Sequence, residues 1–111
     1  MERSGELHLI IHKDSLLGSV RDGQRDRTQD PINQEYYSQV REVLAEIDRV
    51  SQLPNVKLVE HFSFDGQIYK DIGNAEQVII YGCTRPFCLR SVSETAIKAG
   101  AHVSISIKGS I

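Results

Sequence analysis

The sequence predicts an α/β protein with a small, mainly parallel sheet of four to five strands and helices packed on it. Apolar segments typical of strands alternate with segments typical of helices, in the order strand, helix, strand, short helix, strand, helix, strand. Strands that alternate with helices in this way form parallel sheets, because a parallel pair needs a long crossover connection. The length of 111 residues suits one domain, which we expect to span residues 1–111.

Four segments have the composition of strands. The first and third are continuous apolar runs with β-branched residues, which is typical of strands buried on both faces. The last alternates strictly between apolar and polar residues, which indicates that one face lies on the core. The four segments are residues 7–12, 55–62, 77–82 and 102–107.

The clearest helix is predicted for residues 33–51. Asp30 and Pro31 give a start signal, and Pro54 ends the segment. Apolar residues recur at spacings of three and four, as expected for a stripe that faces the core: Val40, Val43, Leu44, Ile47 and Val50. The other face carries Glu35, Gln39, Glu42, Glu46 and Arg49.

Two further helices are expected. A short one is predicted for residues 69–74. A longer one begins at Thr84 or Arg85, with Pro86 in its first turn, and ends at Gly100.

Residues 13–31 are predicted to form a long polar loop. Among them only Leu16, Leu17 and Val20 are apolar, and charged residues and glycines separate them. Long loops are uncommon in small domains and often have a function.

Composition and charge exclude some classes of partner. The net charge is −2 and the isoelectric point is about 6.1, so we expect no nucleic acid and no membrane surface as partner. No apolar run approaches the ~20 residues that span a bilayer, and the first residues do not resemble a signal peptide. A cytoplasmic location is therefore expected, where Cys83 and Cys88 would be free thiols.

The cysteine turn at residues 81–90 is the most informative stretch. A buried strand leads into a helix there, and the first N–H groups of a helix carry partial positive charge. That charge, with Arg85 and Arg90 nearby, is expected to lower the pKa of a cysteine and to favour the nucleophilic thiolate. Cys83 and Cys88 are thus the candidate catalytic residues, although free cysteines often only fill space in a core.

Other polar residues are expected at the same edge of the sheet. His12 and Asp14 follow the first strand, His61 lies at the end of the second, and Thr84 and Arg85 follow the third. Ligands of such sheets gather at the carboxyl ends of the strands, so these five residues are candidate binding residues. The two cysteines and four histidines lack the spacings of a zinc site, and we expect no metal and no cofactor.

Most of the chain resembles the DsrE/DsrF-like sulfur-relay family. The resemblance rests on residues 7–13, 39–47, 55–62 and 77–83, and on the gapless run from Cys83 through Val92, Ile97, Gly100 and Ala101 to Ile111. It implies a Rossmann-like fold and a homo-oligomer. In members that relay sulfur the matching cysteine carries a persulfide, which implies that Cys83 accepts sulfur and that the partner is a sulfur-donor or sulfur-acceptor protein.

A second resemblance is to the isochorismatase-like cysteine hydrolases. Its spacing rests on Gly82, Cys88, Leu89, Arg90, Ala96, Gly100 and Val103. It implies that Cys88 is the nucleophile of a hydrolase of amides or vinyl ethers, or that the chain is a degenerate relative. The aspartate and lysine of that family correspond only loosely to Asp14 and Lys57. Residues 85–88 are faintly similar to glutaredoxin. A third hypothesis is a non-catalytic, homo-oligomeric interaction protein whose cysteines belong to the core.

Overall fold

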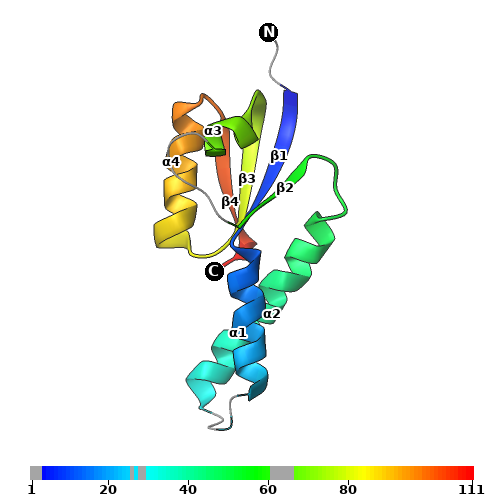
Figure 1. Ribbon diagram of the computed structural model, residues 1–111, viewed down its shortest axis with the longest axis vertical. Helices are drawn as coiled ribbons and strands as arrows, with labels where there is room; N and C mark the ends of the chain where they lie inside the picture. Colours follow the sequence, from blue (N-terminus) through cyan, green and yellow to red (C-terminus); the bar gives the residue numbers. More distant parts are fainter. Residues whose placement is uncertain (1–3, 26, 28–29, 61–66) are drawn as a thin grey trace.

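The protein is an α/β fold with a four-stranded parallel sheet, as a computed structural model shows for residues 4–25, 27, 30–60 and 67–111 (Figure 1). The strands follow the order β2-β1-β3-β4, and each neighbouring pair is parallel. They are β1 (Ser4–Ile11), β2 (Val56–Val59), β3 (Ala75–Gly82) and β4 (His102–Ser110). The predicted fold class is confirmed, and β1 and β3 form the centre of the sheet.

Helices connect the strands. Two of them, α1 (Lys13–Arg25) and α2 (Pro31–Val50), lie between β1 and β2, and α3 (Gln67–Ile72) precedes β3. A π-helical turn, η1 (Arg85–Leu89), runs directly into α4 (Arg90–Lys98), which leads to β4. Among the described residues, no helix is long and apolar enough to cross a membrane.

The two faces of the sheet carry separate apolar clusters, because successive side chains of a strand point to opposite faces. The α2-side core lies under α2 and consists of Ile10, Leu16, Val40, Val43, Ile47, Val50 and Tyr81. The α4-side core lies under α3 and α4 and contains Leu7, Leu9, Ile11, Val59, Ile72, Ala75, Val78, Ile80, Leu89, Val92, Ala96 and Ala101. Burying each large aliphatic side chain contributes about 1.5–3 kcal/mol to the stability of the fold. The two clusters therefore stabilise the packing of the helices on both faces of the sheet.

Residues 13–25 form helix α1, so the polar loop predicted for residues 13–31 is wrong. Leu16 is buried in the α2-side core, and Tyr37 packs so closely on Gly23 that a Cβ there would lie 2.6 Å from the ring Cγ. Helical stability in proteins comes mostly from tertiary packing. Leu16, Val20 and Gly23 recur at helical spacing on the face that packs against the α2-side core and Tyr37, but this stripe is short and charged residues and a second glycine surround it.

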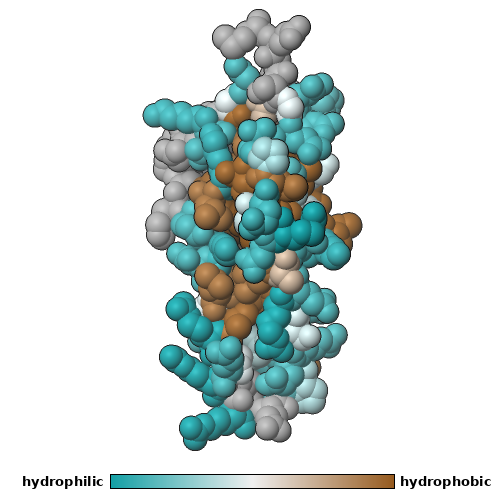
Figure 2. All heavy atoms as spheres, turned by 90° about the vertical axis from the view of Figure 1, so that its right-hand side faces the viewer, coloured by the Kyte–Doolittle hydropathy of each residue, from teal (hydrophilic) through white to brown (hydrophobic). Residues whose placement is uncertain are grey.

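The far halves of α1 and α2 project beyond the sheet. They give the molecule an elongated shape of 55 × 27 × 18 Å (Figure 1). Seen from the side that carries β2, hydrophobic side chains gather at mid-height (Figure 2). Leu58 of the edge strand β2 is 58% exposed and Leu53 just before the strand is 38% exposed. Apolar side chains are thus exposed at the surface of the protein as well as packed in its core.

Candidate functional site

The sheet has a switch point between β1 and β3. The connection after β1 leads to β2 on one side, whereas the connection after β3 leads to β4 on the other. Open α/β sheets bind ligands outside the carboxyl ends of their strands at such a point. His12 and Cys83 directly follow the two strands. Both predicted site residues therefore lie where this fold favours a ligand.

Gly82 shapes the turn after β3. Its φ is 113°, and a Cβ on it would lie 1.9 Å from the carbonyl oxygen of Ile11. Only glycine tolerates both this backbone conformation and this close approach. The Cys83 N–H donates to the Ile11 oxygen at 3.3 Å, and the Ile111 N–H donates to the Gly82 oxygen at 2.9 Å. The turn is thereby tied to the ends of β1 and β4, and its Cys83–Thr84 peptide bond is cis.

Cys83 lies partly buried against the α2-side core. Its thiol donates a weak hydrogen bond to the carbonyl oxygen of His12 at 3.8 Å. Burial raises the pKa of the Cys83 thiol, and the nearby Cys88 and Glu60 act in the same direction. The expected lowering of the Cys83 pKa is therefore wrong, because burial of the thiol raises it.

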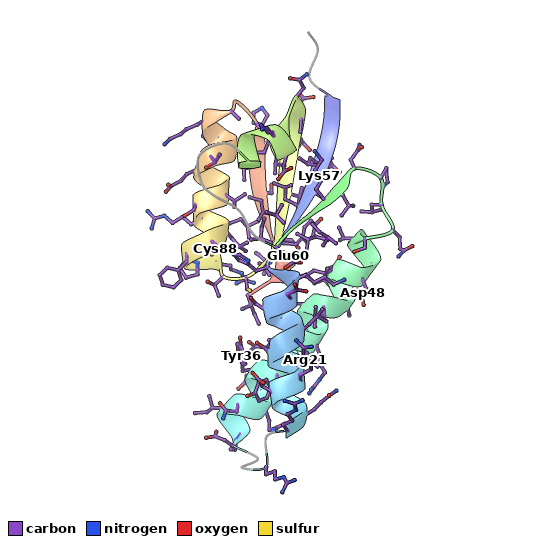
Figure 3. The ribbon with its side chains drawn as sticks, in the orientation of Figure 1. Arg21, Tyr36, Asp48, Lys57, Glu60 and Cys88 are labelled. Carbon is purple, nitrogen blue, oxygen red and sulfur yellow. The ribbon has the colours of Figure 1, made fainter. Side chains whose placement is uncertain are left out.

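Cys88 lies on the other side of the sheet, in η1, where it packs against the α4-side core. The turn is held by Thr84, whose carbonyl oxygen accepts the N–H of Leu89 at 3.1 Å. Cys88 also lines an open hollow of about 380 Å³ together with Pro86, Phe87, Arg90, Ser91 and Glu94. Phe87 is 71% exposed, so an aromatic ring in solvent stands beside this thiol. Figure 3 shows Cys88 where the ribbon leaves β3 for α4.

His12, Asp14 and Glu60 meet at the ends of β1 and β2. His12 has a φ of 56°, and its ring Nδ1 lies 3.0 Å from the carbonyl oxygen of Glu60. The Glu60 carboxylate accepts the backbone N–H of Asp14 at 3.1 Å, near the start of α1. Glu60, labelled in Figure 3, was missed by the sequence analysis because its position after a short edge strand carries no motif. His61, another candidate, lies outside the described residues.

Arg85 holds the end of β4. Its backbone N–H donates to Ile111 at 2.8 Å, and its Nε donates to the Ser110 hydroxyl at 2.8 Å. Its Nη2 donates to the carbonyl oxygens of Ile107 and Ser110 at 2.7 and 2.9 Å. These bonds engage the guanidinium with β4 and show a structural role for this candidate binding residue.

A larger groove, which the sequence analysis did not anticipate, lies between α2 and the end of β4. It has a volume of about 780 Å³, and its lining consists of Gln39, Glu42, Val43, Ala45, Glu46, Arg49, Arg85, Ile107, Lys108, Ser110 and Ile111. The Glu46 side chain is only 7% exposed, although the sequence pattern assigned it to the solvent face of the helix.

The negative charge of the buried Glu46 carboxylate is compensated by Arg49 of α2 and Lys108 of β4. Arg49 donates hydrogen bonds to its Oε1, with Nε at 2.8 Å, and Lys108 reaches its Oε2 at 3.5 Å. The hydrogen bonds from Arg49 hold the pKa of Glu46 below its ordinary value, against the effect of burial, and the charge of Lys108 adds to this. The i,i+3 spacing of Glu46 and Arg49 is visible in the sequence, but no sequence signal links Lys108 to them, because Lys108 comes from a distant strand.

Both cysteines are free thiols. Within the described ranges, no group of three or more histidine, cysteine, aspartate or glutamate side chains is placed to hold a metal ion. Comparison with family models, with curated proteins and with solved structures finds no match to this chain. The site must therefore be interpreted from its own residues.

Proposed function

We propose that the protein is a sulfur carrier of the relay type and that Cys88 accepts sulfur from a partner protein. The observation that carries the proposal is the contrast between the two thiols. Cys88 lies on an open hollow beside an exposed aromatic ring, whereas the thiol of Cys83 is turned toward a backbone carbonyl. The resemblance of most of the chain to the DsrE/DsrF-like family supports the same kind of chemistry.

The transfer needs a thiolate that reaches the sulfur of another protein. The Cys88 thiolate attacks the outer sulfur of a persulfide on the donor, and a new sulfur–sulfur bond forms on Cys88. The sulfur–sulfur bond of the donor breaks, and the donor cysteine leaves as a thiolate, so no external oxidant or reductant is needed. Cys88 suits this step because it lines the surface hollow.

Cys83 is less suited to be the first acceptor, although the family resemblance points to it. Burial raises the pKa of its thiol and so lowers the fraction of thiolate, the form that attacks sulfur. Its Sγ also points to the carbonyl oxygen of His12. We therefore assign the reaction to Cys88 and a packing role at the switch point to Cys83.

The hydrolase hypothesis has weaker support at Cys88. A cysteine hydrolase needs a base within hydrogen-bond reach of its nucleophile. Of the described residues, the one carboxylate that lines the hollow is Glu94, and it pairs with Arg90 at 3.3 Å. An open hollow with Phe87 at its rim fits a protein surface better than it encloses a small substrate.

The predicted homo-oligomer is part of this proposal. Leu58 is exposed on an edge strand whose outer backbone groups have no neighbouring strand in the described sheet. Such an edge is a template for pairing with another chain. Sedimentation should show a concentration-dependent dimer that Leu58→Glu abolishes, with the exposed Ile97→Glu as the control. A wild-type chain that stays monomeric at every concentration refutes this part.

Mass spectrometry tests the sulfur-carrier proposal. The full chain is exposed briefly to limiting polysulfide, digested and mapped for peptides heavier by one sulfur atom. We expect the added sulfur on Cys88 in the wild type and in Cys83→Ser, and no adduct in Cys88→Ser. An adduct that persists in Cys88→Ser, or none on Cys88 in folded wild type, overturns the assignment.

A further inference from the structure

The groove between α2 and β4 shares no lining residue with the hollow at Cys88. Its walls come from α2 and from the C-terminal part of β4, which are far apart in the chain. Its volume of about 780 Å³ is in the range of small-molecule sites, ~300–1,000 Å³. The groove is thus large enough to hold a small organic ligand.

Two cations meet over the buried carboxylate. Arg49 and Lys108 approach opposite oxygens of Glu46, and their own side chains are 64% and 83% exposed. An ammonium group has three donors and a guanidinium has five, so one carboxylate leaves donors of both cations open to a second anion. Glu46 thus holds the two cations side by side at the surface of the groove.

Apolar side chains lie beside these charges. Val43 is buried at the wall formed by α2, and Ile107 on the opposite wall is 80% exposed. Arg85 fixes the backbone of the Ile107 segment through its hydrogen bond at 2.7 Å, so that side chain is presented from an anchored strand end. A ligand that covers Ile107 removes apolar surface from water, which favours binding.

From these observations we propose that the groove binds a small organic carboxylate with an aliphatic body. The carboxylate lies across Arg49 and Lys108, and the aliphatic body covers the exposed Ile107 beside the buried Val43. Charge-assisted hydrogen bonds to the two cations orient the ligand, and the apolar contact supplies the selectivity against simple anions. This site is independent of the proposed thiol chemistry.

A titration followed by NMR of the labelled full chain tests the proposal with hexanoate as the probe. Two matched probes separate the charged contact from the apolar contact. Acetate has the carboxylate without the aliphatic body, and hexanamide has the aliphatic body without the charge. We expect saturable shifts of the Val43, Ile107 and Lys108 amides with hexanoate, and affinities about tenfold weaker or worse for both matched probes. No saturable shift of these amides with hexanoate overturns the proposal.

Substitutions inside and outside the groove test whether hexanoate binds there. Lys108→Met keeps the apolar stem without the charge and should weaken hexanoate binding by about tenfold. Lys98→Met, at an exposed lysine of α4 outside the groove, should leave the affinity unchanged. Equal affinities of Lys108→Met and wild type refute the site. Cys88→Ser should bind hexanoate as the wild type does, so failure of the sulfur-carrier proposal leaves this test intact.

Discussion

Two cysteines follow the same strand and yet differ in their surroundings. Cys83 packs against the α2-side core with its thiol on the His12 carbonyl, whereas Cys88 packs against the α4-side core and lines an open hollow. Both lie near the start of a helix, so the helix field alone does not distinguish them. Both thiols are only partly exposed, so what differs between them is the group that each one faces, and from this difference we predict which thiol is available for chemistry.

The largest expected effect comes from Gly82→Ala, which disrupts the turn that places both thiols. A Cβ would collide with the Ile11 oxygen at 1.9 Å, and a φ of 113° strains any other residue. We expect a loss of about 3 kcal/mol or more in the free energy of unfolding, or no folded protein. Urea denaturation measures this loss.

Gly18→Ala is the matched control. Gly18 lies inside α1, where the nearest atom to a new Cβ is 3.9 Å away. Alanine should stabilise the helix by up to about 1 kcal/mol. Equal stability of Gly82→Ala and Gly18→Ala contradicts the described turn.

A second prediction concerns the anchor of the Cys88 turn. Leu89 is fully buried in the α4-side core, so Leu89→Ala should cost about 2–5 kcal/mol of unfolding free energy through lost burial and the cavity left behind. Ile97→Ala, at a side chain that is 61% exposed in α4, should change stability by no more than about 0.5 kcal/mol. Similar midpoints of thermal unfolding for the two variants show that Leu89 is not the anchor.

Glu60→Gln sharpens the comparison between the thiols. The Glu60 carboxylate contributes to the raised pKa of Cys83, so its removal should shift the pH profile of Cys83 alkylation to lower pH. The profile is measured in a Cys88→Ser background, with Glu94→Gln as a control that leaves it unchanged. A profile that stays in place on Glu60→Gln shows that this carboxylate does not act on Cys83.

The smallest expected effect is the acid dependence that Glu46 gives to stability. The Glu46 pKa is lowered in the fold, so its contribution is complete above the ordinary value of 4.5 and is lost as the pH falls through the folded value. The urea midpoint should therefore fall less on acidification in Glu46→Gln than in the wild type. An identical fall in both proteins means that the Arg49 and Lys108 contacts contribute no stability.

The strands were predictable because they are continuous or alternating apolar segments, and the long helix was predictable because its apolar residues follow a period of 3.6. The segment 77–82 lies within β3, and the stripe from Val40 to Val50 faces the sheet as expected. Helix α1 was missed because its buried face is short, with only Leu16, Val20 and Gly23 at helical spacing, and because two glycines and many charged residues weaken the helical pattern. Local patterns thus reveal an element most clearly when its apolar face is long.

The site was predictable only in outline. The sequence placed His12, Asp14, Cys83 and Arg85 at one edge of the sheet, and the structure confirms that they follow β1 and β3. It did not show that Arg85 would bind the end of β4. Nor did it show that Glu46 would be buried between Arg49 and Lys108, because that pairing depends on a contact between α2 and a distant strand.

Competitive alkylation of the two thiols in one folded sample tests most directly whether Cys88 is the available nucleophile. The wild-type chain is treated at neutral pH with a limiting amount of iodoacetamide, and both cysteine peptides are quantified by mass spectrometry. We predict that Cys88 is modified about tenfold faster than Cys83 or more, since burial raises the pKa of Cys83 and its thiol faces the His12 carbonyl, whereas Cys88 lines the open hollow. Equal modification of the two cysteines, or faster modification of Cys83, would contradict the account.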